Sequence, residues 1–148
     1  MFYTVACELV EECLPGWRQF EDSCYLFINA TLSWTDAEAV CLAELATLVE
    51  IESQEEQDFL VDTAQNGLEW SANGYWIGIS GKAVSYDNWV GSGNAVNYTS
   101  WCPNEPNGSG GYSYLWARKG LCWDDTWNNN MCEALICERA PGPVPESV

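Results

Sequence analysis

Carboxylate and amide side chains carry whatever chemistry this chain can perform, because it contains no histidine. The sequence has 22 Asp and Glu residues against 5 Lys and Arg residues, which gives a formal net charge of -17 at pH 7. The missing histidine excludes imidazole bases, Ser-His and Cys-His nucleophile pairs, and His-ligated zinc. The acidic balance disfavours nucleic acid as a partner, because phosphate binding needs clustered basic side chains. The remaining oxygen donors suit a hard cation such as Ca²⁺.

The 8 cysteines set a second chemical constraint. No two of them form a Cys-x-x-Cys pair, so zinc-ribbon and thioredoxin-like motifs lose their usual signature. An even number at long, irregular spacings indicates a disulfide framework, although spacing alone leaves the pairing open. N-glycosylation sequons begin at Asn29, Asn97 and Asn107 and agree with an oxidising compartment. The sequence therefore predicts a secreted, extracellular protein.

The length of 148 residues is enough for one domain with its own core. Hydrophobic residues make up 47% and aromatic residues 14% of the chain, which excludes a disordered acidic tail. No apolar run approaches the roughly 20 residues that a membrane-spanning helix needs. We divide the chain into an N-terminal segment (1–12), one domain (13–140) and a Pro-rich tail (141–148).

Two helices are expected in the first half of this domain. Ser33 is placed to cap a helix that runs to about Ala43, and Ser53 with Glu56 forms the capping box of a second helix. Hydrophobic alternation predicts short strands at residues 45–51, 75–79, 112–117 and 135–138. Helices followed by short strands and long loops indicate an α+β fold.

The order of motifs along the chain resembles the C-type lectin-like domain family. The motifs that carry the resemblance are Cys13-Leu14-Pro15-Gly16-Trp17, Trp34-x-x-Ala37-x-x-x-Cys41, Trp76-Ile77-Gly78-Ile79, Glu105-Pro106-Asn107 and Ile136-Cys137-Glu138. They cover nearly the whole chain, from about Cys13 to Glu138. The resemblance implies a disulfide-stapled fold with two helices, short antiparallel sheets and a long loop region.

The same resemblance implies the disulfides Cys13–Cys24 and Cys41–Cys137. Cys122 and Cys132 are the candidates for the family's third bridge. Cys7 and Cys102 are unassigned. A bridge between these two cysteines and a homo-oligomer linked through Cys7 both remain open.

The sharpest chemical signal within the resemblance is the Glu105-Pro106-Asn107 motif, whose first peptide bond is expected to be cis. In the family, the Glu and Asn of this motif bind one Ca²⁺, and two sugar hydroxyls complete its coordination. The resemblance implies that Glu105 accepts a hydrogen bond from one hydroxyl while the Asn107 amide donates to the other. In the family this arrangement goes with mannose, glucose, fucose and GlcNAc. Asn107 is therefore expected to be unmodified, which leaves Asn29 and Asn97 as glycosylation candidates.

Two segments compete to complete the calcium shell, Trp123-Asp124-Asp125 and Trp127-Asn128-Asn129. The first is favoured because Asp124, Asp125 and Glu105 together would bring three negative charges to the ion. The alternative interpretation of Asp124 and Asp125 is a solvated acidic turn. A further Glu that the family places just before the cysteine of the intervening strand has no counterpart before Cys122, which predicts a lowered calcium affinity.

These features predict a calcium-dependent lectin for mannose-type glycans, with innate immune recognition of microbial glycans as a role. The expected sugar-contacting residues are Glu105, Asn107, Asp124, Asp125 and Trp127. Two alternatives use the same fold, namely a mineral- or ice-surface-binding protein and a calcium-independent domain that binds a protein ligand. A glycosidase carboxylate pair built on Glu105 has no second signature, so no enzyme is expected.

Overall fold

Both expected helices are present, and strands account for most of the remaining regular structure. The computed structural model describes residues 11–81, 86–108, 111–130 and 132–143. The helical elements are α1 (Trp34–Ala43), α2 (Gln54–Asp62), the π-helical η1 (Thr63–Gly67) and the 3₁₀ turn η2 (Ala117–Lys119). The strands are β1 (Glu11–Glu12), β2 (Arg18–Phe20), β3 (Ser23–Asn29), β4 (Thr47–Leu48), β5 (Gly74–Ser80), β6 (Tyr112–Trp116), β7 (Cys122–Thr126), β8 (Ala134–Arg139) and β9 (Gly142–Pro143).

Serine side chains determine where α1 and α2 begin. The Ser33 hydroxyl accepts a hydrogen bond from the backbone N–H of Asp36, and the Ser53 hydroxyl accepts one from that of Glu56, each at 3.0 Å. Each bond satisfies a backbone donor that the first turn of a helix leaves without a partner. Among the described residues, no helix has the length and apolar character needed to cross a membrane.

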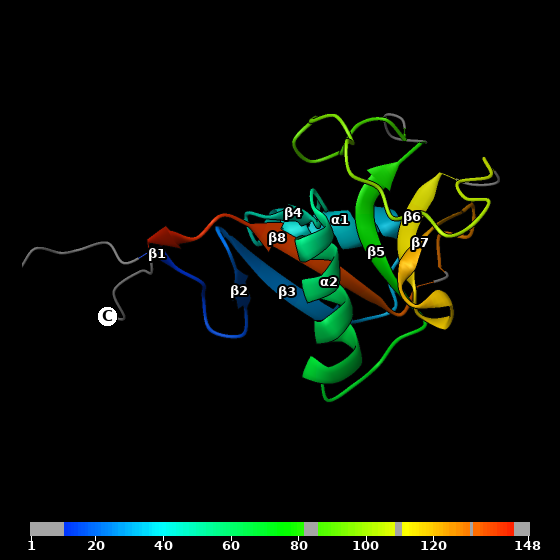
Figure 1. The fold of residues 1–148 in the computed structure, drawn as a ribbon. Helices are drawn as coiled ribbons and strands as arrows, with labels where there is room; N and C mark the ends of the chain where they lie inside the picture. Colours follow the sequence, from blue (N-terminus) through cyan, green and yellow to red (C-terminus); the bar gives the residue numbers. More distant parts are fainter. Residues whose placement is uncertain (1–10, 82–85, 109–110, 131, 144–148) are drawn as a thin grey trace, which may run out of the picture.

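Seven strands form one sheet, in which β2, β3, β8, β5, β6 and β7 follow one another and β4 pairs with β8. The strand pairs of this sheet are antiparallel except for β5 and β8, which run parallel. The sheet is therefore mixed, whereas the sequence predicted antiparallel sheets. β7 is the edge strand beside β6, at the right of the sheet in Figure 1. A separate two-stranded sheet pairs β1 with β9.

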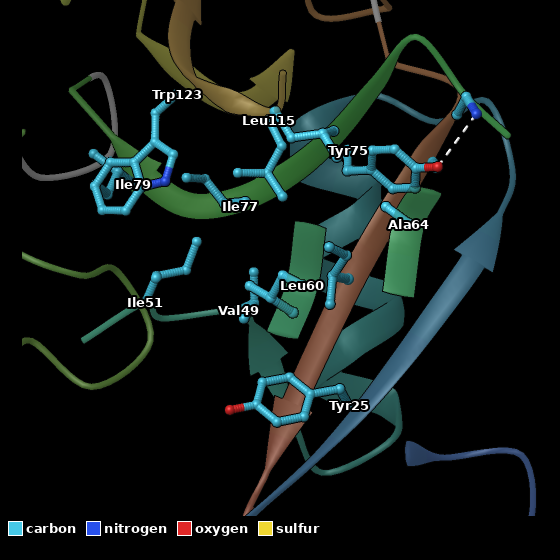
Figure 2. Packing of buried hydrophobic residues seen from close by; sticks show 14 of the residues in the cluster. Tyr25, Val49, Ile51, Leu60, Ala64, Tyr75, Ile77, Ile79, Leu115 and Trp123 are labelled. Carbon is cyan, nitrogen blue, oxygen red and sulfur yellow. Dashed lines mark hydrogen bonds between the residues drawn. The ribbon is translucent and has the colours of Figure 1, made fainter. Parts of the chain in front are cut away.

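Strand β5 is buried along its whole length because a helix packs on each of its faces. Ile77 and Ile79 pack in a cluster with Leu60 of α2, as Figure 2 shows. The intervening Trp76 packs in a second cluster with Trp34 of α1. This division follows from strand geometry, in which successive side chains point to opposite faces.

Three disulfides join described residues, and one of them differs from expectation. Cys13–Cys24 and Cys41–Cys137 are the pairs that the resemblance implies. The third is Cys102–Cys122, so the expected bridge Cys122–Cys132 is wrong, and a bridge from Cys7 to Cys102 is excluded as well. Cys7 itself lies outside the described residues.

Backbone pairing at the edge of the sheet explains the third disulfide. The N–H of Cys102 donates to the carbonyl of Trp123, and the N–H of Trp123 donates to the carbonyl of Ser100, both at 2.8 Å. These bonds place Cys102 beside Cys122 at the start of β7. Cys132 is a buried free thiol packed against β5 instead, so close that a Cβ added at Gly74 would lie 2.7 Å from its sulfur.

Leu45 follows α1 in a left-handed conformation, with φ of 56° and a side chain that is 79% exposed. Glycine is favoured at this position because it has no Cβ to strain. We expect Leu45→Gly to raise the free energy of unfolding by about 0.5–1 kcal/mol, since the exposed side chain contributes little packing. Urea unfolding measures the change. Leu42→Gly, at an exposed position inside α1, is the control and should lower the same free energy by about 0.5–1 kcal/mol. A loss of stability in both variants would contradict the interpretation.

The buried carboxylate of Glu56 and the half-buried carboxylate of Glu138 lie where β3, β8 and α2 meet. Glu138 accepts hydrogen bonds from the Ser23 hydroxyl at 2.7 Å and from the backbone N–H of Glu50 at 3.0 Å. Glu56 accepts a hydrogen bond from the Tyr25 hydroxyl. Burial, followed by the negative charge of Glu56, raises the pKa of Glu138 to about 8, and burial also raises the pKa of Glu56. Deprotonating this pair therefore costs folding free energy.

The pH dependence of stability should reflect Glu138. The pKa of Glu138 in the folded state lies above its value of about 4.3 in the unfolded chain. The contribution of Glu138 to the free energy of unfolding is therefore fully present below a pH of about 4.3, and it is lost as the pH rises through about 8. We expect the free energy of unfolding in EDTA to fall between pH 5.5 and pH 8.5, and Glu138→Gln to reduce that fall by at least about 1.4 kcal/mol, the equivalent of one pKa unit. Glu55→Gln, which changes an exposed acid on α2, should keep the wild-type slope. Equal slopes in all three proteins would contradict this assignment.

Candidate functional site

Three carboxylates converge where the long loop between β5 and β6 meets the outer edge of β7. Glu105, Asp124 and Asp125 each offer an oxygen atom, and these atoms lie within 4.8 Å of one another. Asp124 and Asp125 are only 8% and 4% exposed, whereas Glu105 is half-buried. The interpretation of Asp124 and Asp125 as a solvated turn is therefore wrong, because both belong to a buried strand.

The core anchors β7 immediately before the two aspartates. The Trp123 side chain is fully buried, and its indole N–H donates to the side-chain oxygen of Gln57 at 2.9 Å. The amide of Gln57 donates in turn to the carbonyl of Leu121 at 2.9 Å. Figure 2 shows Trp123 in the same hydrophobic cluster as Ile77 and Ile79. The positions of Asp124 and Asp125 are thus tied to α2 and to the hydrophobic core.

The edge contacts of β7 also position Glu105. The bridge between Trp101 and Trp123 and the Cys102–Cys122 disulfide hold the preceding loop segment against the strand. A turn follows in which the N–H of Glu105 donates to the carbonyl of Cys102 at 3.0 Å. The Glu105–Pro106 peptide bond is cis, as expected. Glu105 therefore reaches the aspartates through a covalently fixed stretch of loop.

Each aspartate oxygen accepts a hydrogen bond from another described residue or from the neighbouring backbone. Asp124 accepts from the Tyr114 hydroxyl at 2.7 Å and from the backbone N–H of Asp125 at 2.8 Å. Asp125 accepts from the Tyr86 hydroxyl at 2.7 Å and from the backbone N–H of Asn107 at 3.2 Å. A carboxylate has about four lone-pair sites, so both aspartates keep capacity for a cation.

The electrostatics of the group favour a bound positive charge. A hydrogen bond with Asp124, partial burial, and the charges of Asp124 and Asp125 raise the pKa of Glu105 to about 7. Close carboxylates repel one another, and either a proton or a cation relieves the repulsion. Three hard oxygen donors with up to three negative charges fit Ca²⁺, which prefers carboxylate and carbonyl oxygens.

The other residues considered for the site divide into two sets. Asn107 lies beside Asp125 through its backbone, and its side chain is exposed, as is that of Trp127, which is 71% exposed just after β7. The side-chain oxygens of Asn128 and Asn129 bind elsewhere. The first accepts from the N–H of Asn130 at 3.1 Å, and the second accepts from the N–H of Trp34 at 2.8 Å, at the start of α1. The side-chain oxygens of Asn128 and Asn129 are therefore engaged away from the carboxylate group.

The sequence places Tyr114 near the site as a candidate for stacking on a sugar, but it assigns neither Tyr114 nor Tyr86 as a donor to the aspartates. Tyr114 stands opposite Asp124 in the pairing of β6 with β7. Recognising residues 122–126 as a strand that follows the turn at Gly120 would have found this pair. Tyr86 comes from the long loop, and no local pattern connects it with Asp125.

Comparisons with known proteins define the family. The family model for the lectin C-type domain matches residues 30–139, so the chain belongs to the C-type lectin domain family, whose members are non-enzymatic. The chain is 32% identical over 137 residues to C-type lectin domain family 4 member G of Mus musculus, in an alignment that covers 87% of this chain and 43% of that protein. The chain thus spans less than half of that relative's length.

Solved structures share the fold at a similar level of identity. A complex of SPL-1 with GlcNAc has a TM-score of 0.76 and 30% identity, and the match covers 86% of this chain and 95% of that one. A calcium-independent type II antifreeze protein has a TM-score of 0.74 and 31% identity, with coverage of 87% and 95%. The relatives thus include both a sugar-bound protein and a calcium-independent one.

Proposed function

We propose that this chain is a calcium-dependent lectin domain that binds glycans of the mannose, glucose and GlcNAc type. The observation that carries the proposal is the convergence of Glu105, Asp124 and Asp125 beside Asn107. Family membership and the GlcNAc complex of a relative support carbohydrate as the ligand class.

In this proposal, Glu105, Asn107, Asp124 and Asp125 would hold one Ca²⁺ through their side-chain oxygens. Such an ion would supply open coordination positions for two neighbouring sugar hydroxyls. Glu105 accepts a hydrogen bond from one hydroxyl, and the Asn107 amide donates one to the other. The exposed ring of Trp127 packs on the sugar face.

Glycan affinity chromatography tests the proposal directly. We expect retention on immobilised mannose and GlcNAc in the presence of calcium, release by EDTA, and weaker retention on galactose. Calcium-independent retention, or no retention on any of the three sugars, would overturn it.

Trp127 should affect sugar binding without affecting calcium binding. We expect Trp127→Ala to weaken glycan binding about tenfold, because a lost aromatic contact costs about 0.5–1.5 kcal/mol in addition to the buried area. Calcium affinity should stay at the wild-type value, as isothermal titration calorimetry can show. Leu42→Ala, which removes another exposed apolar side chain, is the control and should change neither. Parallel losses of calcium and sugar affinity would contradict this role.

The proposal includes secretion, a microbial glycan as target, and homo-oligomers that raise weak single-site affinity. Asn29 and Asn97 are exposed and can accept glycans. A glycan on Asn107 would block the site, so peptide mapping should find that residue unmodified. Full occupancy of Asn107 would refute the lectin assignment.

A calcium-independent surface binder is the second candidate. It is favoured by the likeness to a calcium-independent type II antifreeze protein. Thermal hysteresis that persists in EDTA, together with no retention on sugars, would support this candidate over the lectin.

A further inference from the structure

Two tyrosine hydroxyls bind the two aspartates of the site, one hydroxyl to each. Tyr114 donates to Asp124 from the neighbouring strand β6, and its side chain is 1% exposed. Tyr86 donates to Asp125 from the long loop, and its ring packs edge-on against Trp101 at 6.0 Å. Both bonds measure 2.7 Å, and neither tyrosine is a ligand in the proposed function.

The two aspartates are held by separate donors although they are consecutive residues of one strand. Their oxygens lie within 4.8 Å of each other, yet Asp124 accepts from Tyr114 of β6 and Asp125 accepts from Tyr86 of the loop. Repulsion among the three carboxylates also drives them apart when no cation is present. Tyr114 and Tyr86 act from different elements and oppose this separation.

Both hydroxyls are suited to be permanent donors. The ordinary pKa of a tyrosine hydroxyl, about 10, lies well above neutral pH. Each therefore stays protonated and donates to a carboxylate oxygen. It adds no charge to the site, so it orients a ligand without replacing one.

We propose that Tyr86 and Tyr114 are positioning residues that hold Asp125 and Asp124 in the arrangement required for calcium and so determine calcium affinity. The inference rests on the proposed function, because it assigns the aspartates as calcium ligands. It also accounts for how a site without the family's further Glu is organised, since orientation of the remaining ligands offsets part of the missing charge.

Single hydroxyl deletions test the inference by calorimetric calcium titration. Tyr86→Phe and Tyr114→Phe should each weaken calcium binding by about 10- to 100-fold, the usual effect of losing a group that orients a metal ligand. Tyr98→Phe is a matched control. Its hydroxyl donates to Gln54 at 2.9 Å, and its ring packs on Trp123 at 6.0 Å, so it loses a comparable bond in the same loop. Its calcium affinity should equal that of the wild type.

Terbium luminescence separates positioning from general structural support. Tb³⁺ serves as a calcium substitute, and its lifetimes in H₂O and D₂O report the number of bound waters. If a hydroxyl positions its aspartate, deleting it should release that ligand and add about one water. A residue that only supports the fold would leave the water number unchanged.

The outcomes distinguish a failure of this inference from a failure of the proposed function. A wild-type chain that binds neither Ca²⁺ nor Tb³⁺ would overturn the proposed function and this inference with it. Wild-type binding combined with control-like affinity and water number in both Phe variants would overturn the inference alone. Tyr86 lies in a loop, so its variant keeps the test decisive if loss of the buried Tyr114 hydroxyl perturbs folding.

Discussion

Asp125→Asn is expected to weaken calcium binding at least about 100-fold while the chain remains folded, because charge count sets calcium affinity. Asn has nearly the same shape as Asp, and its oxygen can still accept from the N–H of Asn107. Its amide N–H₂ can donate to the Tyr86 oxygen, where the carboxylate of Asp125 now accepts from that hydroxyl. The substitution thus removes one negative charge and little else. Glycan binding should be lost together with calcium binding.

The same variant should be at least as stable as the wild type in EDTA. Neutralising Asp125 removes repulsion with Asp124 and Glu105, which lie within 4.8 Å of it through their oxygens. Calorimetric calcium titration and thermal unfolding in EDTA measure the two effects. Asp58→Asn, which changes an exposed acid of α2, is the control and should alter neither quantity. Lost calcium binding accompanied by a clear fall in stability would indicate misfolding and contradict the ligand role.

Removal of the Cys41–Cys137 disulfide should have the largest effect on stability. The bridge ties α1 to β8 across a sequence separation of 96 residues. In the chain-entropy model, a loop of that length corresponds to about 4–5 kcal/mol. Because domains are stable by about 5–15 kcal/mol, Cys41→Ala with Cys137→Ala should leave the chain close to unfolding. Alanine is suitable because both positions are fully buried and a serine hydroxyl there would need a partner.

The short N-terminal loop provides the comparison for this prediction. Cys13 and Cys24 are separated by 11 residues, so their replacement by Ala should cost less, about 3 kcal/mol. Urea unfolding of both double variants without reductant measures the difference. Equal losses would contradict loop length as the cause.

Local patterns predicted the parts of the fold whose stability is itself local. Ser33 and Ser53 could be assigned as helix caps because a cap forms between residues three apart. The strands at 75–79, 112–117 and 135–138 were found with boundaries within one or two residues. The strand expected at 45–51 is shorter in the structure, where β4 consists of Thr47 and Leu48, the two residues in register with β8.

Long-range pairing decided what the local patterns left open. Cys102 and Cys122 are joined because the loop before Glu105 pairs with the outer edge of β7, and cysteine spacing does not report such pairing. Cys132 keeps a free thiol because its expected partner, Cys122, is joined to Cys102.

By itself, the sequence determined the class of this protein and the side chains that could bind calcium. The ordered motifs indicated the family, and the carboxylates at positions 105, 124 and 125 were named from residue type and charge. Only the tertiary structure shows that the oxygens of Asp124 and Asp125 lie beside Glu105, whereas those of Asn128 and Asn129 accept hydrogen bonds elsewhere. It also supplied the tyrosine hydroxyls that hold the aspartates. The physical reason is that a binding site is defined by which edges and loops meet in space, and those contacts join residues too far apart in the chain to leave a local signal.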